Sequence, residues 1–409
     1  MSTKTQEEGV DAPITISFKQ FVDYAFAHWL ESVKLGIPCK TMCLLGPPGI
    51  GKSATAYALS KRMTDYIRAN PDVLYKGTKP ASEPTAACRL LDFSSMLPED
   101  LNGLPFRDGD FTRYCPQEWV GELCGDHAFG VVVQDDLPAA APAMHTAGRQ
   151  MALERRIHEH RFGPGILIIV TGNRREDKSA AKTLPAHFSN SVTLLGIAPD
   201  VDEWKKWYGR QEHHDGIVAA FLTWQPGLFS KLPVDHDKMG AFPTPRQWTN
   251  VGRQFKAANA AGSDVLFAVV AGLVAKGPAT TFLGFVEIHS KLPDPEAVFD
   301  NPLKMLPDVQ SKLDRADKQI AMTCALGDVA ARRWKKAKGA ERNEVPVKLM
   351  RALAHVCDGI GEYSATGVQT FLDAGGNLTA IAKVARDYRS DAVIGPLLDH
   401  VKESLLGGA

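Results

Sequence analysis

Residues 46–53 read GPPGIGKS, and this stretch decides the fold. The apolar run Met42 to Leu45 precedes it, and a helical pattern over residues 53–70 follows it, ended by Pro71. A G-x-x-x-x-G-K-S sequence between a strand and a helix is the pattern of a phosphate-binding loop. Its glycines permit close backbone approach, so that successive amides and the helix N-terminus surround phosphate oxygens. The alternative is a glycine-rich turn that binds nothing.

The residues of this loop have separate expected roles in binding ATP and Mg²⁺. Lys52 would reach the β and γ phosphates, and the Ser53 hydroxyl would ligate magnesium. The full set expected to contact the nucleotide is Gly46, Pro47, Pro48, Gly49, Ile50, Gly51, Lys52, Ser53 and Ala54.

A second acidic site is expected at the end of a buried strand. Residues 129–136 read FGVVVQDD, an apolar run that ends in two carboxylates. Ligands bind at the carboxyl ends of parallel strands, so Asp135 there can hold magnesium opposite Lys52. Asp136 lies one residue beyond, where a base or a water-orienting carboxylate is needed. A solvated acidic turn is the alternative.

The first half of the chain alternates short β-rich runs with helical stretches, which predicts a parallel sheet with crossover helices. From about residue 200 the periodicity is helical, and a proline-rich stretch between residues 293 and 307 suggests a boundary. We expect an N-terminal tail and helix over 1–38, an α/β nucleotide-binding domain over 39–198, a helical lid over 199–300 and a helical extension over 301–409. The expected strands are Thr41 to Leu45, Cys88 to Phe93, Phe129 to Gln134, Ile166 to Val170 and Val192 to Leu195.

Composition excludes several classes of protein. Lys plus Arg and Asp plus Glu are both 47, so the formal net charge is zero and no chain-wide field favours nucleic acid or a membrane surface. The longest apolar run, Val265 to Ala275, is too short to span a membrane, and the polar start is no signal peptide, so we expect a cytoplasmic protein. Seven cysteines without a Cys-x-x-Cys argue against a disulfide framework and a zinc site.

Six motifs follow one another along the chain. They are LLGPPGIGKS (44–53), LLDFSSMLPEDLNGLPF (90–106), VVVQDDLPAA (131–140), LERRIHEHRF (153–162), ILIIVTGNR (166–174) and FPTPRQW (242–248). This ordered series resembles the AAA+ ATPases, and more narrowly their MoxR-like branch, which is related to the dynein-like AAA domains. The resemblance covers roughly residues 14–310 and implies an α/β P-loop NTPase core with an all-helical lid. It also implies that Asn173 is sensor 1, which helps to place the attacking water, and that Arg246, after Pro245, is the sensor 2 arginine.

Two departures from the family pattern bear on hydrolysis. The family carries Asp-Glu in the acidic motif, whereas this chain has Asp135 and Asp136, and a misplacement near 1 Å can cost on the order of 100-fold in rate. The family also supplies an arginine finger from the neighbouring subunit, but the corresponding stretch, LPAHFSNSV (184–192), holds no arginine. The nearest alternatives are Arg155, Arg156, Arg174 and Arg175.

Three further segments are candidates for contact with a partner. In MoxR-like proteins an insert near the second helix and a hairpin before sensor 1 face a central pore. The matching segments in this chain are about Leu101 to Tyr114 and Ile157 to Phe162. The aromatic side chains of the first segment either grip a substrate or pack locally. The segment RRWKKAKGAER (332–342) carries six basic residues and one acid, for which we favour a solvated helix end over a nucleic-acid contact. His158, His160, His213 and His214 show no recognisable metal-ligand spacing.

These observations predict a magnesium- and ATP-dependent AAA+ ATPase of MoxR type. The resemblance implies a hexameric ring that remodels or activates a protein target, often with a von Willebrand factor A domain partner. One alternative is a nucleotide-gated scaffold that binds ATP, assembles and hydrolyses little. A nucleic-acid motor or loader is the other, supported only by residues 332–342.

Overall fold

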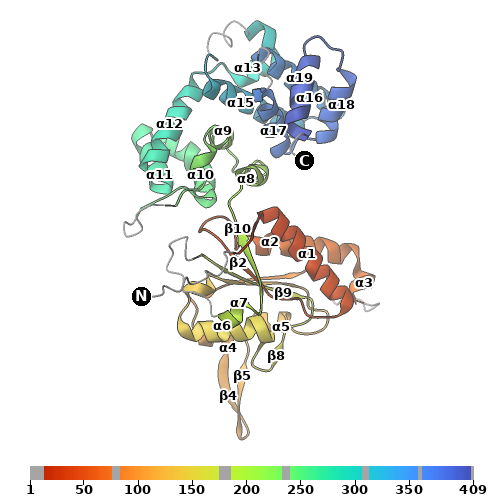
Figure 1. Cartoon of the computed structure of the whole chain (residues 1–409), viewed down its shortest axis with the longest axis vertical. Coiled ribbons are helices and arrows are strands. Elements are labelled where there is room, and N and C mark those ends of the chain that lie inside the picture. The colour runs from red at the N-terminus through yellow and green to blue at the C-terminus, as the bar shows by residue number, and fades with distance from the viewer. Residues whose placement is uncertain are drawn as a thin grey trace, which may run out of the picture. The chain divides into compact units, whose positions relative to one another are not determined.

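The computed structural model describes residues 13–75, 83–174, 186–232, 240–305, 313–357 and 362–406. It divides into two compact units, residues 1–200 and residues 201–409 (Figure 1).

Unit 1 is built on a six-stranded sheet in which every neighbouring pair is parallel. The five strands expected from the sequence are confirmed, with ends shifted by one or two residues. The sixth, β1 (Thr15–Ile16), was not predicted and lies at the edge of the sheet beside β10. The strands, in their order across the sheet, are β1 (Thr15–Ile16), β10 (Thr193–Ile197), β2 (Met42–Leu45), β9 (Ile166–Gly172), β6 (Gly130–Asp135) and β3 (Ala87–Asp92).

Helices cover both faces of this sheet, which explains why the central strands are apolar throughout rather than alternating (Figure 1). Met42 and Leu44 of β2 belong to the cluster that includes Trp29 of α1 (Phe18–Leu35) and residues of α2 (Thr55–Ala69). Cys43, between them, belongs to the opposite cluster with Met144 of α6 (Pro142–Glu154). Successive side chains of one strand therefore fill two separate cores.

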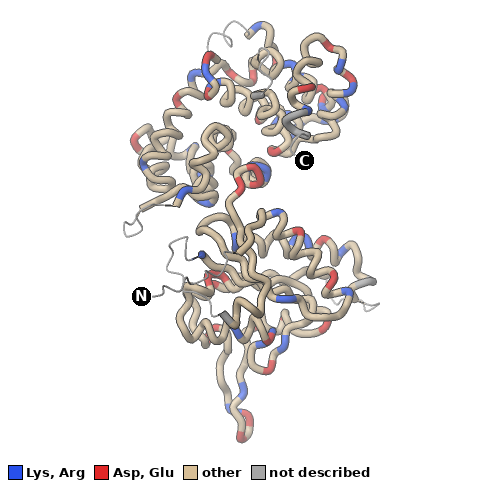
Figure 2. The backbone as a smooth tube through the Cα atoms, in the orientation of Figure 1, with Lys and Arg blue, Asp and Glu red and all other residues tan. Residues whose placement is uncertain are grey.

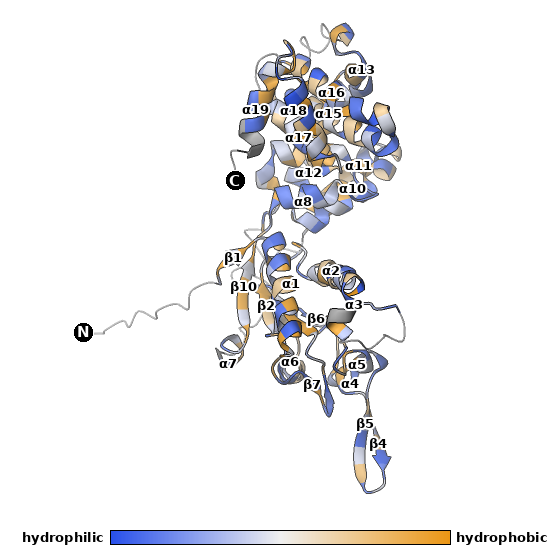
Figure 3. Ribbon diagram, turned by 90° about the vertical axis from the view of Figure 1, so that its right-hand side faces the viewer, coloured by the Kyte–Doolittle hydropathy of each residue, from blue (hydrophilic) through white to orange (hydrophobic). Residues whose placement is uncertain are grey.

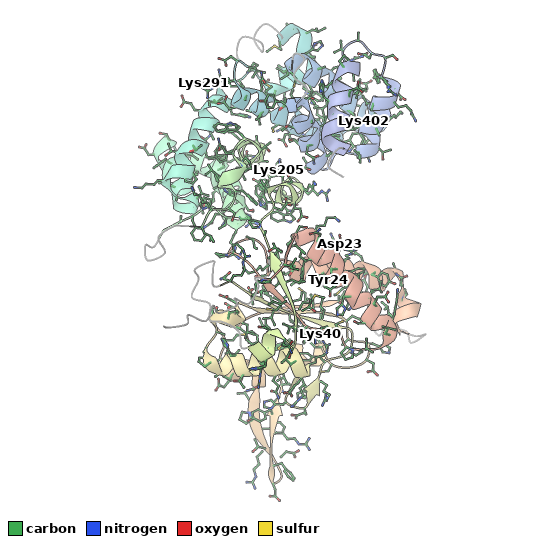
Figure 4. All side chains as sticks on the ribbon, in the orientation of Figure 1. Asp23, Tyr24, Lys40, Lys205, Lys291 and Lys402 are labelled. Carbon is green, nitrogen blue, oxygen red and sulfur yellow. The ribbon has the colours of Figure 1, made fainter. Side chains whose placement is uncertain are left out.

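The first helix begins and ends as its sequence predicts. The Ser17 side chain accepts from the Gln20 amide and the Gln20 side chain accepts from the Ser17 amide, which forms a capping box. Gly36 ends the helix with φ of 67°. Asp23, labelled in Figure 4, accepts a hydrogen bond from Arg62 and so ties α1 to α2.

Two hairpins extend from unit 1. The first joins β4 (Leu104–Asp108) to β5 (Phe111–Cys115), is exposed along both strands except at Tyr114, and projects from the sheet (Figure 3). The second joins β7 (Arg156–Ile157) to β8 (His160–Arg161). The remaining short elements of the unit are α3 (Pro71–Tyr75), α4 (Pro98–Asn102), α5 (Glu118–Glu122), η1 (Leu137–Ala139) and α7 (Ala186–Ser189).

All the secondary-structure elements in the described part of unit 2 are helices, as the periodicity predicts. Its hydrophobic residues form two clusters, and α15 supplies side chains to both of them, as well as packing on α9, α13 and α17. The boundary expected at residue 300 falls between α13 and α15, two helices that pack on each other. The elements are α8 (Val201–Tyr208), α9 (Gly216–Trp224), η3 (Pro226–Leu228), α10 (Pro245–Ala260), α11 (Ser263–Val274), α12 (Lys276–Ser290), α13 (Pro295–Asp300), α15 (Ala316–Lys336), α16 (Gly339–Val356), α17 (Glu362–Asp373), α18 (Leu378–Asp387) and α19 (Gly395–Leu406).

None of the helices in the described part of the chain combines the length and the apolar character that crossing a bilayer requires.

Candidate functional site

The glycine-rich loop connects β2 to α2, as the sequence predicts. Gly49 and Gly51 have φ of 74° and 101°, a backbone region that side chains disfavour. Gly46 lies against the end of β10, because a Cβ at this position would stand 2.5 Å from the Ile197 carbonyl oxygen. The three glycines are therefore required by the shape of the loop itself.

The Lys52 side chain is largely buried and lies inside the loop. Its ammonium donates to the carbonyl oxygens of Gly46 and Pro47, at 2.8 and 2.7 Å, and to Oδ1 of Asn173 at 2.8 Å. Asn173 directly follows β9, so this contact links the loop to the strand end from which sensor 1 was expected. The structure thus brings together two site residues that are 121 positions apart.

Asp135, the last residue of β6, is held between two hydroxyl groups. Ser53 Oγ donates to its Oδ2 at 2.7 Å, and Thr171 Oγ1, from the neighbouring strand β9, donates to its Oδ1. The two residues that were expected to hold magnesium, Ser53 and Asp135, are therefore in direct contact. Thr171 was not among the predicted site residues, although it is the polar residue in the otherwise apolar run ILIIVTG.

Asp136 follows β6 in a left-handed backbone conformation, with φ of 53° and ψ of 37°. Aspartate is one of the few residues besides glycine that adopts this region readily. Burial raises the pKa of its carboxyl group, and the charge of Asp135 raises it further, while Lys52 opposes both effects. Its Oδ1 is buried and has no hydrogen-bond partner among the described residues.

The strand order explains this convergence. β9 lies between β2 and β6, and all three run parallel, so their carboxyl ends meet at one edge of the sheet. The loop with Lys52 and Ser53 follows β2, the two aspartates end β6, and Asn173 follows β9. This edge is where open parallel sheets bind their ligands.

The oxygen atoms at this edge of the sheet are suitable ligands for a magnesium ion. Mg²⁺ prefers oxygen ligands and usually takes one or two carboxylates together with phosphate oxygens and water. The Ser53 hydroxyl oxygen and Oδ2 of Asp135 lie 2.7 Å apart. The next residue, Asp136, has a buried Oδ1 without a hydrogen-bond partner among the described residues. Ser53 and Asp135 would hold the ion.

Arg246 lies in unit 2, where it is exposed at the start of α10. The helix begins as predicted, because Thr244 caps the Gln247 amide and Pro245 occupies its first turn. The other expected site residues all belong to unit 1.

Three of the four arginines named as alternative fingers, Arg155, Arg156 and Arg174, interact with groups of their own chain. Arg155 is partly buried and donates to three backbone carbonyls near the amino ends of β2 and β9. Arg156 pairs with Glu154 at 2.6 Å and donates to the His158 carbonyl oxygen. Arg175 and part of the stretch 184–192 lie outside the described residues.

The aromatic residues of the first hairpin divide between two environments. Phe106 and Phe111 are 48% and 74% exposed. Tyr114 instead stacks on His158 of the second hairpin, with ring centroids 4.0 Å apart and planes at 13°. The two hairpins are therefore joined by a ring contact, while the outer aromatic side chains face solvent.

The basic segment 332–342 is partly neutralised within unit 2. Arg332 and Arg333, at the end of α15, form ion pairs with Glu296, and Arg333 also pairs with Asp300 of α13. Figure 2 shows acidic and basic residues interspersed along the unit. His214 pairs with Asp328 at 3.0 Å, and no metal-binding cluster occurs among the residues that the structure describes.

The parallel sheet with its flanking helices and the loop after β2 are compatible with the core of a P-loop NTPase. No family model matches the chain, and no curated protein matches it in a sequence search.

Proposed function

We propose that this chain is a magnesium-dependent, ATP-binding and ATP-hydrolysing AAA+ protein of MoxR type that works in the cytoplasm. One observation carries the proposal: Lys52, Ser53, Asp135, Asp136 and Asn173 lie together where the parallel strands end. A structural glycine turn would need none of the three polar residues, Asp135, Asp136 and Asn173, that lie beside this loop.

The proposed chemistry is positional and electrostatic. The loop amides and the Lys52 ammonium would neutralise charge on the β and γ phosphates. Ser53 and Asp135 would hold magnesium, which would supply positive charge next to the phosphate oxygens. Asp136 and Asn173 would orient the attacking water, with Asp136 in its ionised form as the acceptor of a proton.

The protein is proposed to act as a hexameric ring that remodels or activates a protein target, with a von Willebrand factor A domain protein as a candidate partner. The exposed side chains of Phe106 and Phe111 on the first hairpin support a protein target. Contact between large apolar side chains and water is unfavourable, and a protein partner would bury this apolar surface. Arg246, as the sensor 2 arginine, is proposed to contact the γ phosphate of ATP bound to its own subunit.

The test is phosphate release from MgATP over a wide range of protein concentrations, with Lys52→Ala as the blank. A specific activity that rises with concentration and vanishes in the variant is the expected result, because the site would then be completed between subunits. Release at the blank level, with or without candidate partners, would refute the claim of hydrolysis.

A nucleotide-gated scaffold is the second candidate function. Two observations favour it, because both argue against rapid hydrolysis. The side chain of Asp136 is shorter than the glutamate that the family carries at this place, and Arg155 donates to backbone carbonyls of its own chain instead of reaching a neighbouring subunit. Assembly that depends on ATP while phosphate release stays at the blank level would select it. The ion pairs of Arg332 and Arg333 weigh against a nucleic-acid motor, for which salt-sensitive DNA binding would be required.

A further inference from the structure

Strand β9 carries one polar side chain in its interior. Thr171 is completely buried, within a run of seven residues that are all buried. A hydroxyl group in such a place needs hydrogen-bond partners, because burying it without them costs free energy. Its partners identify its role.

The Thr171 hydroxyl contacts both aspartates at the end of the adjacent strand. It donates to Oδ1 of Asp135, and it accepts from the backbone amide of Asp136 at 3.4 Å. The second oxygen of Asp135 accepts from Ser53 at 2.7 Å. The carboxylate is thus fixed from both sides by neutral hydroxyl groups, one on each neighbouring element.

This arrangement determines how the carboxylate is oriented. The terminal torsion of an aspartate has a broad, roughly two-fold profile, so the carboxylate can rotate unless its partners hold it. Ser53 alone fixes one oxygen, and it is itself an expected ligand of the metal. Thr171 fixes the other oxygen and also contacts the amide that precedes the left-handed turn at Asp136.

We infer that Thr171 is a positioning residue that orients Asp135 toward Mg²⁺ and steadies the backbone of Asp136. The inference rests on the proposed function, because it concerns the same MgATP site. Thr171 itself would touch neither nucleotide nor metal. Residues that hold metal-binding carboxylates typically change metal affinity or activity by about 10- to 100-fold when they are removed.

The simpler explanation is that Thr171 only satisfies buried polar groups and stabilises the sheet. Thr41 offers a matched control, because it is also a buried threonine, and its hydroxyl donates to the Ala152 carbonyl at 2.5 Å, next to the start of β2 and away from the acidic residues. A purely structural role would make Thr171→Val and Thr41→Val alike. A positioning role separates them by their dependence on magnesium.

The experiment measures ATP affinity of the full chain as a function of free Mg²⁺, and again in EDTA, together with thermal unfolding. We expect Thr171→Val to raise the half-saturating Mg²⁺ concentration about 10- to 100-fold. Affinity in EDTA should stay within about two-fold of the unsubstituted chain, Thr171→Ser should restore the magnesium dependence, and Thr41→Val should leave it unchanged. If Thr171→Val does not fold, Thr171→Cys, a weak donor, should give an intermediate shift.

The outcomes separate the inference from the proposed function. Magnesium-dependent ATP binding by the unsubstituted chain, with the same magnesium dependence in Thr171→Val or Thr171→Cys, overturns the inference alone. A shift of equal size in Thr41→Val overturns it as well. ATP binding by the unsubstituted chain that is no better than that of Lys52→Ala overturns the proposed function instead.

Discussion

The guanidinium of Arg155 has no carboxylate partner among the residues that the structure describes, and its replacement tests what this arginine does. It donates to the carbonyl oxygens of Cys39, Gly163 and Ile166 at 3.0, 2.9 and 2.6 Å. Cys39 and Gly163 precede β2 and β9, and Ile166 is the first residue of β9, so the side chain joins the amino ends of two adjacent strands. Burial lowers the pKa of the guanidinium.

The magnitude follows from the three acceptors. In Arg155→Met each carbonyl loses its donor, at about 1–3 kcal/mol for a buried group left unsatisfied. Removing a buried charge returns part of this cost. We therefore expect the free energy of unfolding of unit 1 to fall by about 3 kcal/mol, which would rank among the larger effects of a single substitution.

The assay is urea unfolding of the full chain, followed by hydrogen exchange of peptides from residues 39–45 and 163–172, which reports on unit 1. Arg156→Met is the matched control, since its half-exposed pair with Glu154 should contribute less than about 1 kcal/mol. A loss below about 1 kcal/mol in Arg155→Met would refute the reasoning. Loss of hydrolysis with unchanged stability would assign Arg155 to a neighbouring active site instead.

Three further substitutions have definite expected outcomes. Gly46→Ala should destabilise the chain by about 1–3 kcal/mol and weaken ATP binding, because the added Cβ would stand 2.5 Å from the Ile197 carbonyl oxygen; urea unfolding and nucleotide titration measure both. Asp136→Asn should abolish hydrolysis. It should also raise the free energy of unfolding at pH 7, because folding raises the pKa of Asp136 and ionisation of this carboxyl group therefore opposes folding. The gain should disappear well below pH 3.8, where the carboxyl group is protonated in both the folded and the unfolded state. Unfolding curves at the two pH values measure this difference. Tyr114→Ala should cost about 0.5–1.5 kcal/mol by removing the stack on His158, and hydrogen exchange of residues 104–115 should rise.

The sequence predicts the centre of unit 1 well because glycine and lysine at fixed spacing admit few local structures. The strand and the helix on either side of GPPGIGKS follow from its apolar run and helical periodicity. The carboxylates of Asp135 and Asp136 could be assigned to a sheet edge for the same reason, since they end an apolar run. Parallel pairing then brings distant strand ends together.

Other features depend on contacts that no local pattern contains. A two-residue strand such as β1 shows no periodicity, and its existence depends on backbone pairing with residues about 180 positions later. In the sequence, Thr171 is one β-branched residue among several in a predicted strand. Its role becomes visible only from its contact with Asp135 on the adjacent strand. The division of Phe106 and Tyr114 between solvent and a ring contact depends on where a second hairpin lies.

The short strand β1 also has a consequence for how the sheet meets other chains. It pairs Thr15 and Ile16 with Gly196 and Ile197, and so covers part of the open hydrogen-bonding side of β10. Uncovered strand edges recruit strands from other molecules and begin aggregation. A shortened chain that starts after Ile16 should therefore show a new tendency to self-associate through β10, close to the residue that packs on Gly46.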